Sequence, residues 1–185
     1  MDRKRLYLAG PGVFLHDQAA IFAAKKKLCR AYDFEGVRPV EKDPPEHLHG
    51  AHAALWVRRE NLEILESCWG VIANCTPFRG ISADVGTAYE MGYAAARSMP
   101  VFAYSNEYRS LSARMHCPRG GYAASWPASS IIEDFDTADN AMLVGHEQGG
   151  VMATPNYICD ASMMWSHLGT FEDALKRAQA LAKEW

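Results

Sequence analysis

The chain has 185 residues, of which 49% are apolar, and a formal net charge of −3 at neutral pH. This length and composition fit one compact domain over residues 1–185, and the lack of a long apolar run or a signal peptide argues for a cytoplasmic protein without a membrane partner. The five cysteines lack a CxxC spacing and the lysines and arginines form no stripe, which argues against a disulfide framework, a structural zinc site and a nucleic-acid partner.

The first expected elements are a strand and a long helix. Residues 5–10, RLYLAG, have the apolar character of a strand and run into the breaker Gly10-Pro11-Gly12. Residues 16–34 have apolar side chains at helical spacing, with Asp17 as a candidate N-cap. The basic run 25–27 is then expected on the solvated face of this helix. The stripe that should face the core comprises Ala20, Ala23, Ala24, Leu28 and Ala31.

Strand and helix patterns continue to alternate through the centre of the chain. The expected elements are a strand at 36–40, a proline-containing loop at 41–50, a helix at 51–67, a strand at 70–74, a helix at 83–98 and a strand at 101–105. Residues 106–130 keep no single period, which is typical of an excursion over a site or of an oligomer contact.

The last segment, residues 170–185, predicts a C-terminal helix. Thr170 and Asp173 resemble a capping box at its start. Its apolar stripe comprises Phe171, Ala174, Leu175, Ala178 and Leu181. Because strands alternate with helices along the chain, the sequence predicts an α/β fold: a doubly wound parallel sheet in a flavodoxin-like three-layer sandwich.

Two junctions between a strand and a helix are candidates for a ligand site, because open α/β sheets bind ligands outside the carboxyl ends of their strands. The first is YLAGPGVF at 7–14, where Pro11, Val13 and Phe14 resemble an apolar wall for a base or a sugar. The second is ANCTPFRGISADVGTAYE at 73–90, which joins the strand at 70–74 to the next helix.

Glu90 is the unusual residue of the second junction, because its neighbours are small or apolar. Gly86, Glu90 and Ala94 share one helix face at four-residue spacing, which leaves room for a ligand beside the carboxylate. Asp84 lies at or before the first turn and could face the same pocket, although this stretch alone favours a plain N-cap over a catalytic role. Two neighbouring carboxylates beside a small-residue surface suit retaining glycosyl transfer, in which one attacks the anomeric carbon and the other handles the proton of the leaving group.

The segment Asn74 to Ala94, NCTPFRGISADVGTAYEMGYA, resembles the signature of the nucleoside 2-deoxyribosyltransferase family. The opening YLAGPGVF and the later DNAML at 139–143 are similar to further blocks of this family, in the same order. The resemblance implies an enzyme that exchanges the base of a 2'-deoxynucleoside for another free base through a covalent deoxyribosyl ester. No metal or organic cofactor is implied.

The resemblance also implies roles for individual residues. Glu90 corresponds to the nucleophile, Asp84 to the acid/base group and Tyr7 to the tyrosine whose hydroxyl holds the nucleophile. Asn140 and Met142 correspond to a pair that a neighbouring subunit contributes to the sugar pocket, which implies a homo-oligomer. Asn140 could instead cap a short helix after 139, and a strand tyrosine is most often part of the core. The candidate substrate-binding set comprises Gly10, Phe14, Asn61, Asn74, Gly86, Asn140 and Met142.

Four other classes of protein compete with this interpretation. A dinucleotide-binding module is disfavoured because the first junction lacks the GxGxxG spacing and Pro11 removes an amide. A metal enzyme is disfavoured because His47, His49 and His52 lie in a proline-containing loop without a carboxylate at ligand spacing. The closest rival is an N-glycosidase of 2'-deoxynucleoside 5'-monophosphates, which would need a phosphate cradle that the apolar first junction lacks. A non-catalytic nucleoside sensor would leave the two carboxylates without a purpose.

Overall fold

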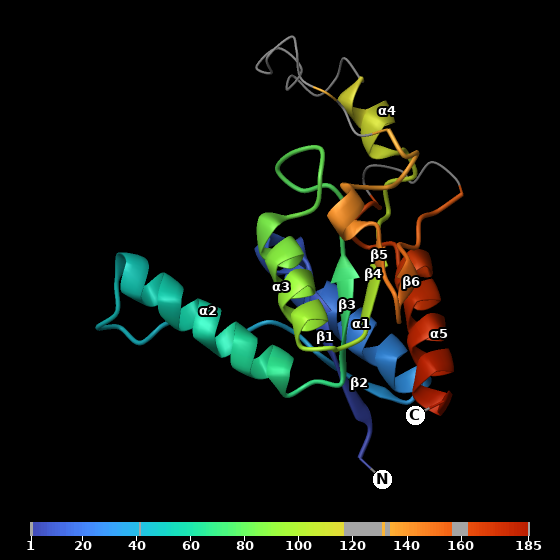
Figure 1. The fold of residues 1–185 in the computed structure, drawn as a ribbon. Helices are drawn as coiled ribbons and strands as arrows, with labels where there is room; N and C mark the ends of the chain where they lie inside the picture. The colour runs from blue at the N-terminus through green and yellow to red at the C-terminus, as the bar shows by residue number, and fades with distance from the viewer. Residues whose placement is uncertain (1, 41, 117–130, 132–133, 157–162, 185) are drawn as a thin grey trace.

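The computed structural model describes residues 2–40, 42–116, 131, 134–156 and 163–184. Its centre is a parallel sheet with the strand order β2-β1-β3-β4 (Figure 1). The strands are β1 (Lys4–Ala9), β2 (Phe34–Val37), β3 (Gly70–Asn74) and β4 (Val101–Tyr104). The longer helices are α1 (Gln18–Ala31), α2 (Gly50–Glu66), α3 (Val85–Ala96) and α5 (Gly169–Glu184). None of the helices in the described ranges is long and apolar enough to cross a membrane.

Helices cover both faces of the sheet. Alternate side chains of a strand point to opposite faces, so Leu6 and Leu8 of β1 pack with residues of α1 and α5. Tyr7 and Ala9 instead pack with residues of α3 and of the end of α2. The predicted doubly wound, three-layer α/β fold is therefore confirmed.

Shorter elements complete the described part of the chain. The 3-10 helices η1 (Pro11–Phe14) and η4 (Ala141–Leu143) and the helix α4 (Leu111–Met115) follow the carboxyl ends of the strands. A hairpin of β5 (Gly145–His146) and β6 (Gly150–Val151) lies beside β4, with Gly149 against Val101 at the start of that strand. Where a fifth strand would extend the flavodoxin-like order, Ala153 forms an isolated parallel bridge with Tyr104. Of the segment expected to be an excursion, residues 111–115 form α4, and residues 117–130 lie outside the described part of the chain.

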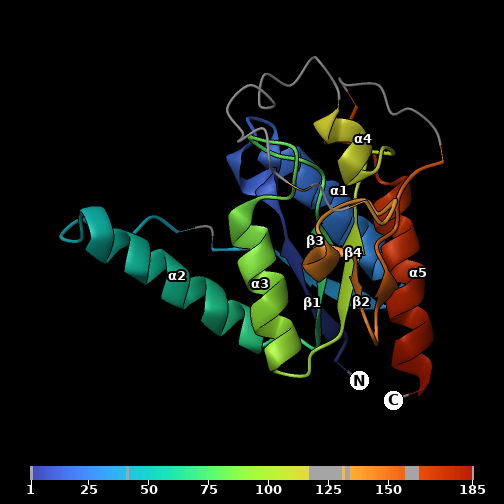
Figure 2. The ribbon, with the colours of Figure 1, turned by 45° about the horizontal axis from the view of Figure 1, so that its top comes forward.

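The helix α2 projects sideways from the body, as both views show (Figures 1 and 2). Leu65, in its last turn, is its buried residue. Leu55, in its second turn, is 60% exposed. The body of the protein therefore anchors this helix at its C-terminal end.

Two sequence predictions are wrong at element ends. The strand expected at 36–40 lies at Phe34–Val37, because Asp33 adopts a left-handed conformation with φ of 65° that turns the chain from α1 directly into β2. Thr170 does not cap α5 from outside, since the helix begins at Gly169 and the buried Thr170 hydroxyl donates to the side chain of Asn106. Asp173 pairs with Lys176 at 2.9 Å instead of completing a capping box.

The core-facing stripe of α1 also differs from the prediction. Four residues of the predicted stripe are exposed: Ala20, Ala23, Ala24 and Ala31. The buried residues are Ile21, Phe22, Lys25 and Cys29. Large side chains at 21 and 22 contribute more buried apolar area than the alanines do, so the helix is rotated to place them against the sheet and α5. The Asp17 side chain stands at the N-cap position but makes no capping bond.

Lys25 is consequently buried, and its expected place on a solvated face is wrong. The side-chain Nζ lies over the rings of Phe22, Tyr104 and Phe171 at 5.5, 5.7 and 5.6 Å from their centroids. Burial lowers the pKa of Lys25 to about 8. The aromatic faces attract the cation and offset part of this desolvation cost.

We expect Lys25→Met to raise the free energy of unfolding at pH 7 by about 1–3 kcal/mol, because it removes a desolvated charge and keeps the apolar stem. In the wild type, the unfolded chain binds the Lys25 proton more tightly than the folded one does. The contribution of this group to stability should therefore increase as pH rises from about 8 toward 10.5. Urea unfolding of the wild type and of Lys25→Met at pH 7, about 8 and about 10.5 measures both effects. The control is Lys27→Met, because Lys27 is exposed. Equal or lower stability of Lys25→Met at pH 7 would contradict the assignment.

Candidate active site

Tyr7 and Glu90 form a hydrogen-bonded pair between the sheet and a helix. The hydroxyl of Tyr7 on β1 donates to Oε1 of Glu90 on α3 at 2.6 Å. Strand alternation directs Tyr7, which is fully buried, toward the α3 face of the sheet. The tyrosine thus fixes the Glu90 carboxylate on the side of α3 that packs against β1.

The surroundings of this pair shift both pKa values. Burial raises the pKa of Glu90 to about 7, the Tyr7 hydrogen bond acts in the opposite direction, and the charge of Asp84 raises it further. Burial, followed by the negative charge of Glu90, raises the pKa of Tyr7 far above its ordinary value. Tyr7 therefore remains a donor, while Glu90 changes charge near neutral pH. Glu90 is a carboxylate that can be ionised yet is poorly solvated.

Asp84 lies directly before α3 and caps it. Its Oδ2 accepts from the backbone N–H groups of Gly86 at 3.0 Å and Thr87 at 3.3 Å, so the N-cap alternative is confirmed as geometry. A Cβ on residue 86 would lie 3.0 Å from Asp84 Oδ2, which explains why the smallest residue stands there. Capping uses one carboxylate oxygen and fixes the side chain within the electrostatic reach of Glu90.

Aromatic rings and a cation gather on the loops that follow β1 and β3. Phe14, at the end of η1, stacks on Phe78 with 5.7 Å between centroids and 12° between planes. Trp165 meets Phe78 edge-on at 5.7 Å. The guanidinium of Arg79 lies 4.7 Å from the Phe14 centroid and 4.8 Å from the Phe78 centroid. Phe14 is 55% exposed, so this aromatic rim presents ring surface to solvent.

Gly10 and Asn74 lie against each other where β1 and β3 end. Gly10 has a φ of 139°, and a Cβ there would lie 2.7 Å from Cβ of Asn74. Asn74 is buried, and its Oδ1 accepts from the N–H of Thr76 at 3.1 Å and from its hydroxyl at 2.7 Å. The Asn74 carbonyl oxygen thus faces into the turn after β3. A direct contact of either residue with substrate stays a prediction.

Asn61 lies on α2 and holds the segment after β2. Its Oδ1 accepts from the backbone N–H of Val40 at 2.8 Å. This bond gives Asn61 a structural role. Its role in substrate binding stays a prediction.

Asn140 and Met142 lie on a different flank of α3 from Glu90. They line a groove of about 540 Å³ together with Ala88, Met91 and Gly92 of that helix. At about 100° per residue, these three positions point away from the Glu90 direction. Within one chain, the pair and the Tyr7–Glu90 site therefore occupy opposite sides of α3.

The local structure at this pair is a capped 3-10 helix. The Oδ1 of Asn140 accepts from the N–H of Met142 at 3.0 Å, which confirms the capping alternative for Asn140. Met142 is 86% exposed and presents its side chain to the outside.

Sequence reasoning missed several residues of this edge of the sheet. Phe78 and Arg79 stand inside the quoted signature, so a candidate list that covered its aromatic and basic residues would have included them. Trp165 carries no local signal, since 87 residues separate it from Phe78. Among the residues that the structure describes, no three His, Cys, Asp or Glu side chains cluster as a metal site requires.

We expect Tyr7→Phe to raise the pKa of Glu90 by about 1–2 units, because a hydrogen bond to a charged acceptor contributes roughly 1.5–3 kcal/mol. Carbon-13 NMR of the glutamate carboxyl groups measures the titration directly. Tyr32→Phe is the matched control, because Tyr32 donates to Glu172 at the same 2.6 Å distance far along the chain. An unchanged Glu90 titration in Tyr7→Phe would show that the bond does not support the carboxylate.

Comparisons with known proteins agree with the fold and identify the family. The solved structure of the 2-desoxiribosyltransferase from Leishmania mexicana superposes with a TM-score of 0.63 at 25% identity, and the match covers 94% of this chain and 97% of that one. An uncharacterized protein of Schizosaccharomyces pombe is 31% identical over 107 residues, 56% of this chain and 51% of that protein. The chain thus spans about half the length of this curated relative. The family model for nucleoside 2-deoxyribosyltransferase matches residues 6–142, so the chain belongs to the nucleoside 2-deoxyribosyltransferase family.

Proposed function

We propose that the protein transfers the 2-deoxyribosyl group between nucleobases through a covalent ester on Glu90. The observation that carries this proposal is the Tyr7–Glu90 pair, in which a carboxylate with a pKa of about 7 is held at 2.6 Å by a tyrosine. A desolvated carboxylate is a stronger nucleophile than a hydrated one, and near neutral pH a large fraction of it is ionised.

The proposed reaction has two displacements. Glu90 uses the oxygen not held by Tyr7 to attack C1' of the deoxyribose, and the C1'–N bond to the base breaks as Asp84 donates a proton to the base. In the second step, a different base attacks C1', the ester bond breaks, and Glu90 is restored while Asp84 recovers a proton. Each displacement inverts C1', so the product retains the original anomeric configuration.

The proposed substrates are 2'-deoxynucleosides and free nucleobases, with the aromatic rim of Phe14, Phe78 and Trp165 as the surface on which a base stacks. We further propose a cytoplasmic homo-oligomer in which Asn140 and Met142 complete the site of a neighbouring subunit. Their place on the flank of α3 opposite Glu90 supports this, because they cannot serve the site of their own chain from there.

We expect Glu90→Gln to lower base exchange by roughly 10³-fold or more, since the amide is nearly the same size but is a far weaker nucleophile. The assay incubates 2'-deoxyinosine, or separately thymidine, with free adenine and follows the products by chromatography. Glu172→Gln is the matched control, because Glu172 also accepts from a tyrosine. Full exchange activity in Glu90→Gln would exclude Glu90 as the nucleophile.

Asp84→Asn should retain the fold, because asparagine is an equally good N-cap. It should slow cleavage by about 10²–10⁴-fold for bases that leave poorly without a proton. Thermal unfolding together with rates for a series of leaving bases measures both effects. An equal rate loss for every base, combined with a lower melting temperature, would assign Asp84 to capping alone.

The second candidate function is hydrolysis of 2'-deoxynucleoside 5'-monophosphates, and Arg79 is the observation that favours it. Its guanidinium lies over the ring of Phe14 on the rim, where it could attract a phosphate. The first junction itself offers little to such an anion, since Pro11 has no N–H and Val13 and Phe14 are apolar.

We expect 2'-deoxyinosine to be cleaved at least about tenfold faster than its 5'-monophosphate, because a phosphate without enough partners loses several kcal/mol of hydration. Adding adenine should divert the sugar from water to the acceptor. Arg79→Ala should leave the ratio of the two rates nearly unchanged. Preference for the monophosphate without base exchange, abolished in Arg79→Ala, would support the hydrolase instead. Tight binding of either compound without turnover would support a sensor.

A further inference from the structure

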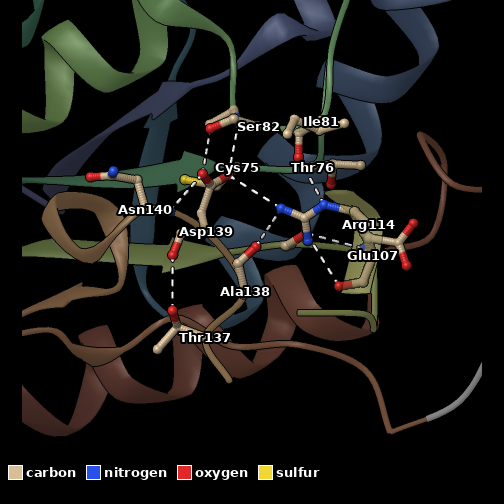
Figure 3. Close-up of polar contacts among 12 residues, drawn as sticks. Cys75, Thr76, Ile81, Ser82, Glu107, Arg114, Thr137, Ala138, Asp139 and Asn140 are labelled. Carbon is tan, nitrogen blue, oxygen red and sulfur yellow. Dashed lines mark hydrogen bonds and ion pairs between the residues drawn. The ribbon is translucent and has the colours of Figure 1, made fainter. Parts of the chain in front are cut away.

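Asp139 is a buried carboxylate that joins two separate segments at the carboxyl edge of the sheet (Figure 3). Its Oδ2 accepts from the backbone N–H of Ala83 at 2.8 Å. Its Oδ1 accepts from the backbone N–H of Asn140 at 2.8 Å and from the hydroxyl of Ser82. The side chain is 0% exposed. One of the two segments leads directly into Asp84, and the other carries Asn140.

Arg114, on α4, binds the same two segments through their carbonyl groups. Its Nε donates to the carbonyl of Ile81 at 2.8 Å, and its Nη2 donates to the carbonyl of Ala138 at 2.6 Å. Nη2 also lies 3.8 Å from Oδ2 of Asp139. The rigid fork of the guanidinium thus holds carbonyl groups on both sides while the carboxylate holds amides, and each charge compensates the other (Figure 3).

We propose that Asp139 is a positioning residue of the active site, which fixes Asp84 and Asn140 relative to each other through the backbone. The inference rests on the proposed function. The Ala83 N–H immediately precedes Asp84, so the bond to Asp139 sets where α3 begins and where its capping carboxylate stands. Since we propose that Asn140 serves the neighbouring subunit, one buried side chain links the acid of one site to a residue of the next.

The chemistry of the pair explains why a carboxylate is needed. Asp139 accepts three hydrogen bonds on two oxygens, whereas an amide has one acceptor oxygen and an NH₂ group that would face an N–H donor. Asp139→Asn must therefore lose the bond to the N–H of Ala83 or that to the N–H of Asn140. It also removes the Asp139 charge from beside Arg114 and leaves Glu107 as the remaining negative charge that acts on this guanidinium.

The test compares leaving groups with and without a need for a proton. 2'-Deoxyguanosine needs protonation of its base, whereas 7-methyl-2'-deoxyguanosine already carries a positive charge on the base and releases it without a proton. We expect Asp139→Asn to lower kcat for the first at least about tenfold more than for the second, because misplacing Asp84 affects proton donation, whereas misplacing Asn140 affects both nucleosides alike.

The matched control is Asp134→Asn. Asp134 stands on the same segment and accepts from the hydroxyl of Ser112 at 2.8 Å, so it contacts α4 but neither side of the proposed link. Should Asp139→Asn fail to fold, Ser82→Ala removes only the hydroxyl donor and keeps the charge. It should show the same selective loss at a smaller size.

Amide hydrogen exchange gives a second measurement that needs no activity. Asp139→Asn should accelerate exchange in residues 81–86 and 140–143 and leave the strands unchanged. Equal loss of kcat for both nucleosides, or faster exchange throughout the sheet, would show that Asp139 serves only folding and would overturn the inference. If the wild type cleaves neither nucleoside, the proposed function fails, and amide hydrogen exchange alone tests the structural role of Asp139. Unchanged hydrogen exchange in residues 81–86 and 140–143 of Asp139→Asn would show that Asp139 does not hold the two segments together.

Discussion

The hydrogen bond from Tyr7 to Glu90 connects the central strand of the sheet to the helix that begins at its carboxyl edge. An ionised carboxylate that has lost much of its water is costly, and a single neutral donor offsets only part of that cost. The desolvation cost that the Tyr7 hydrogen bond does not offset raises the pKa of Glu90. The position of α3 and the cap at its start fix where this carboxylate lies, and under the proposed function the sugar binds beside it.

The buried carboxylate of Asp139 plays a different part, because its charge is matched by Arg114 and its oxygens are fully used. A buried ion pair that bonds to backbone groups of two segments contributes more to fixing one arrangement than to net stability. The two acids differ in their surroundings: Glu90 accepts from the hydroxyl of Tyr7 through one oxygen, whereas both oxygens of Asp139 accept hydrogen bonds. Asp84 lies six residues before Glu90 in the chain and directly after Ala83, whose N–H donates to Asp139.

Local patterns were sufficient to predict most of the fold. The strands β1, β3 and β4 and the helices α2, α3 and α5 follow from apolar period and breakers, and the four-residue spacing of Gly86, Glu90 and Ala94 predicted the face that carries the carboxylate. The rotation of α1 was not predictable in this way, because the rings that surround Lys25 come from β4 and α5, far along the chain. The contacts of Asp139 and Arg114 were not predictable either. Their partners include backbone groups of segments far away in the sequence, and no residue pattern marks such contacts. Capping by Asp84 and Asn140 was foreseen as an alternative, and it coexists with the proposed roles because each uses one side-chain oxygen.

The central claim is that Glu90 becomes covalently attached to the sugar. Incubation with a 2-fluoro analogue of a 2'-deoxynucleoside should trap the ester, because the electron-withdrawing fluorine destabilises the oxocarbenium-like transition state of the second displacement more than it slows formation of the adduct. Protease digestion followed by mass spectrometry should then find the fluorinated sugar on the peptide that contains Glu90, and free adenine should release it as the adenine nucleoside. An adduct on any other residue, or turnover without an adduct and with inversion at C1', would contradict the account.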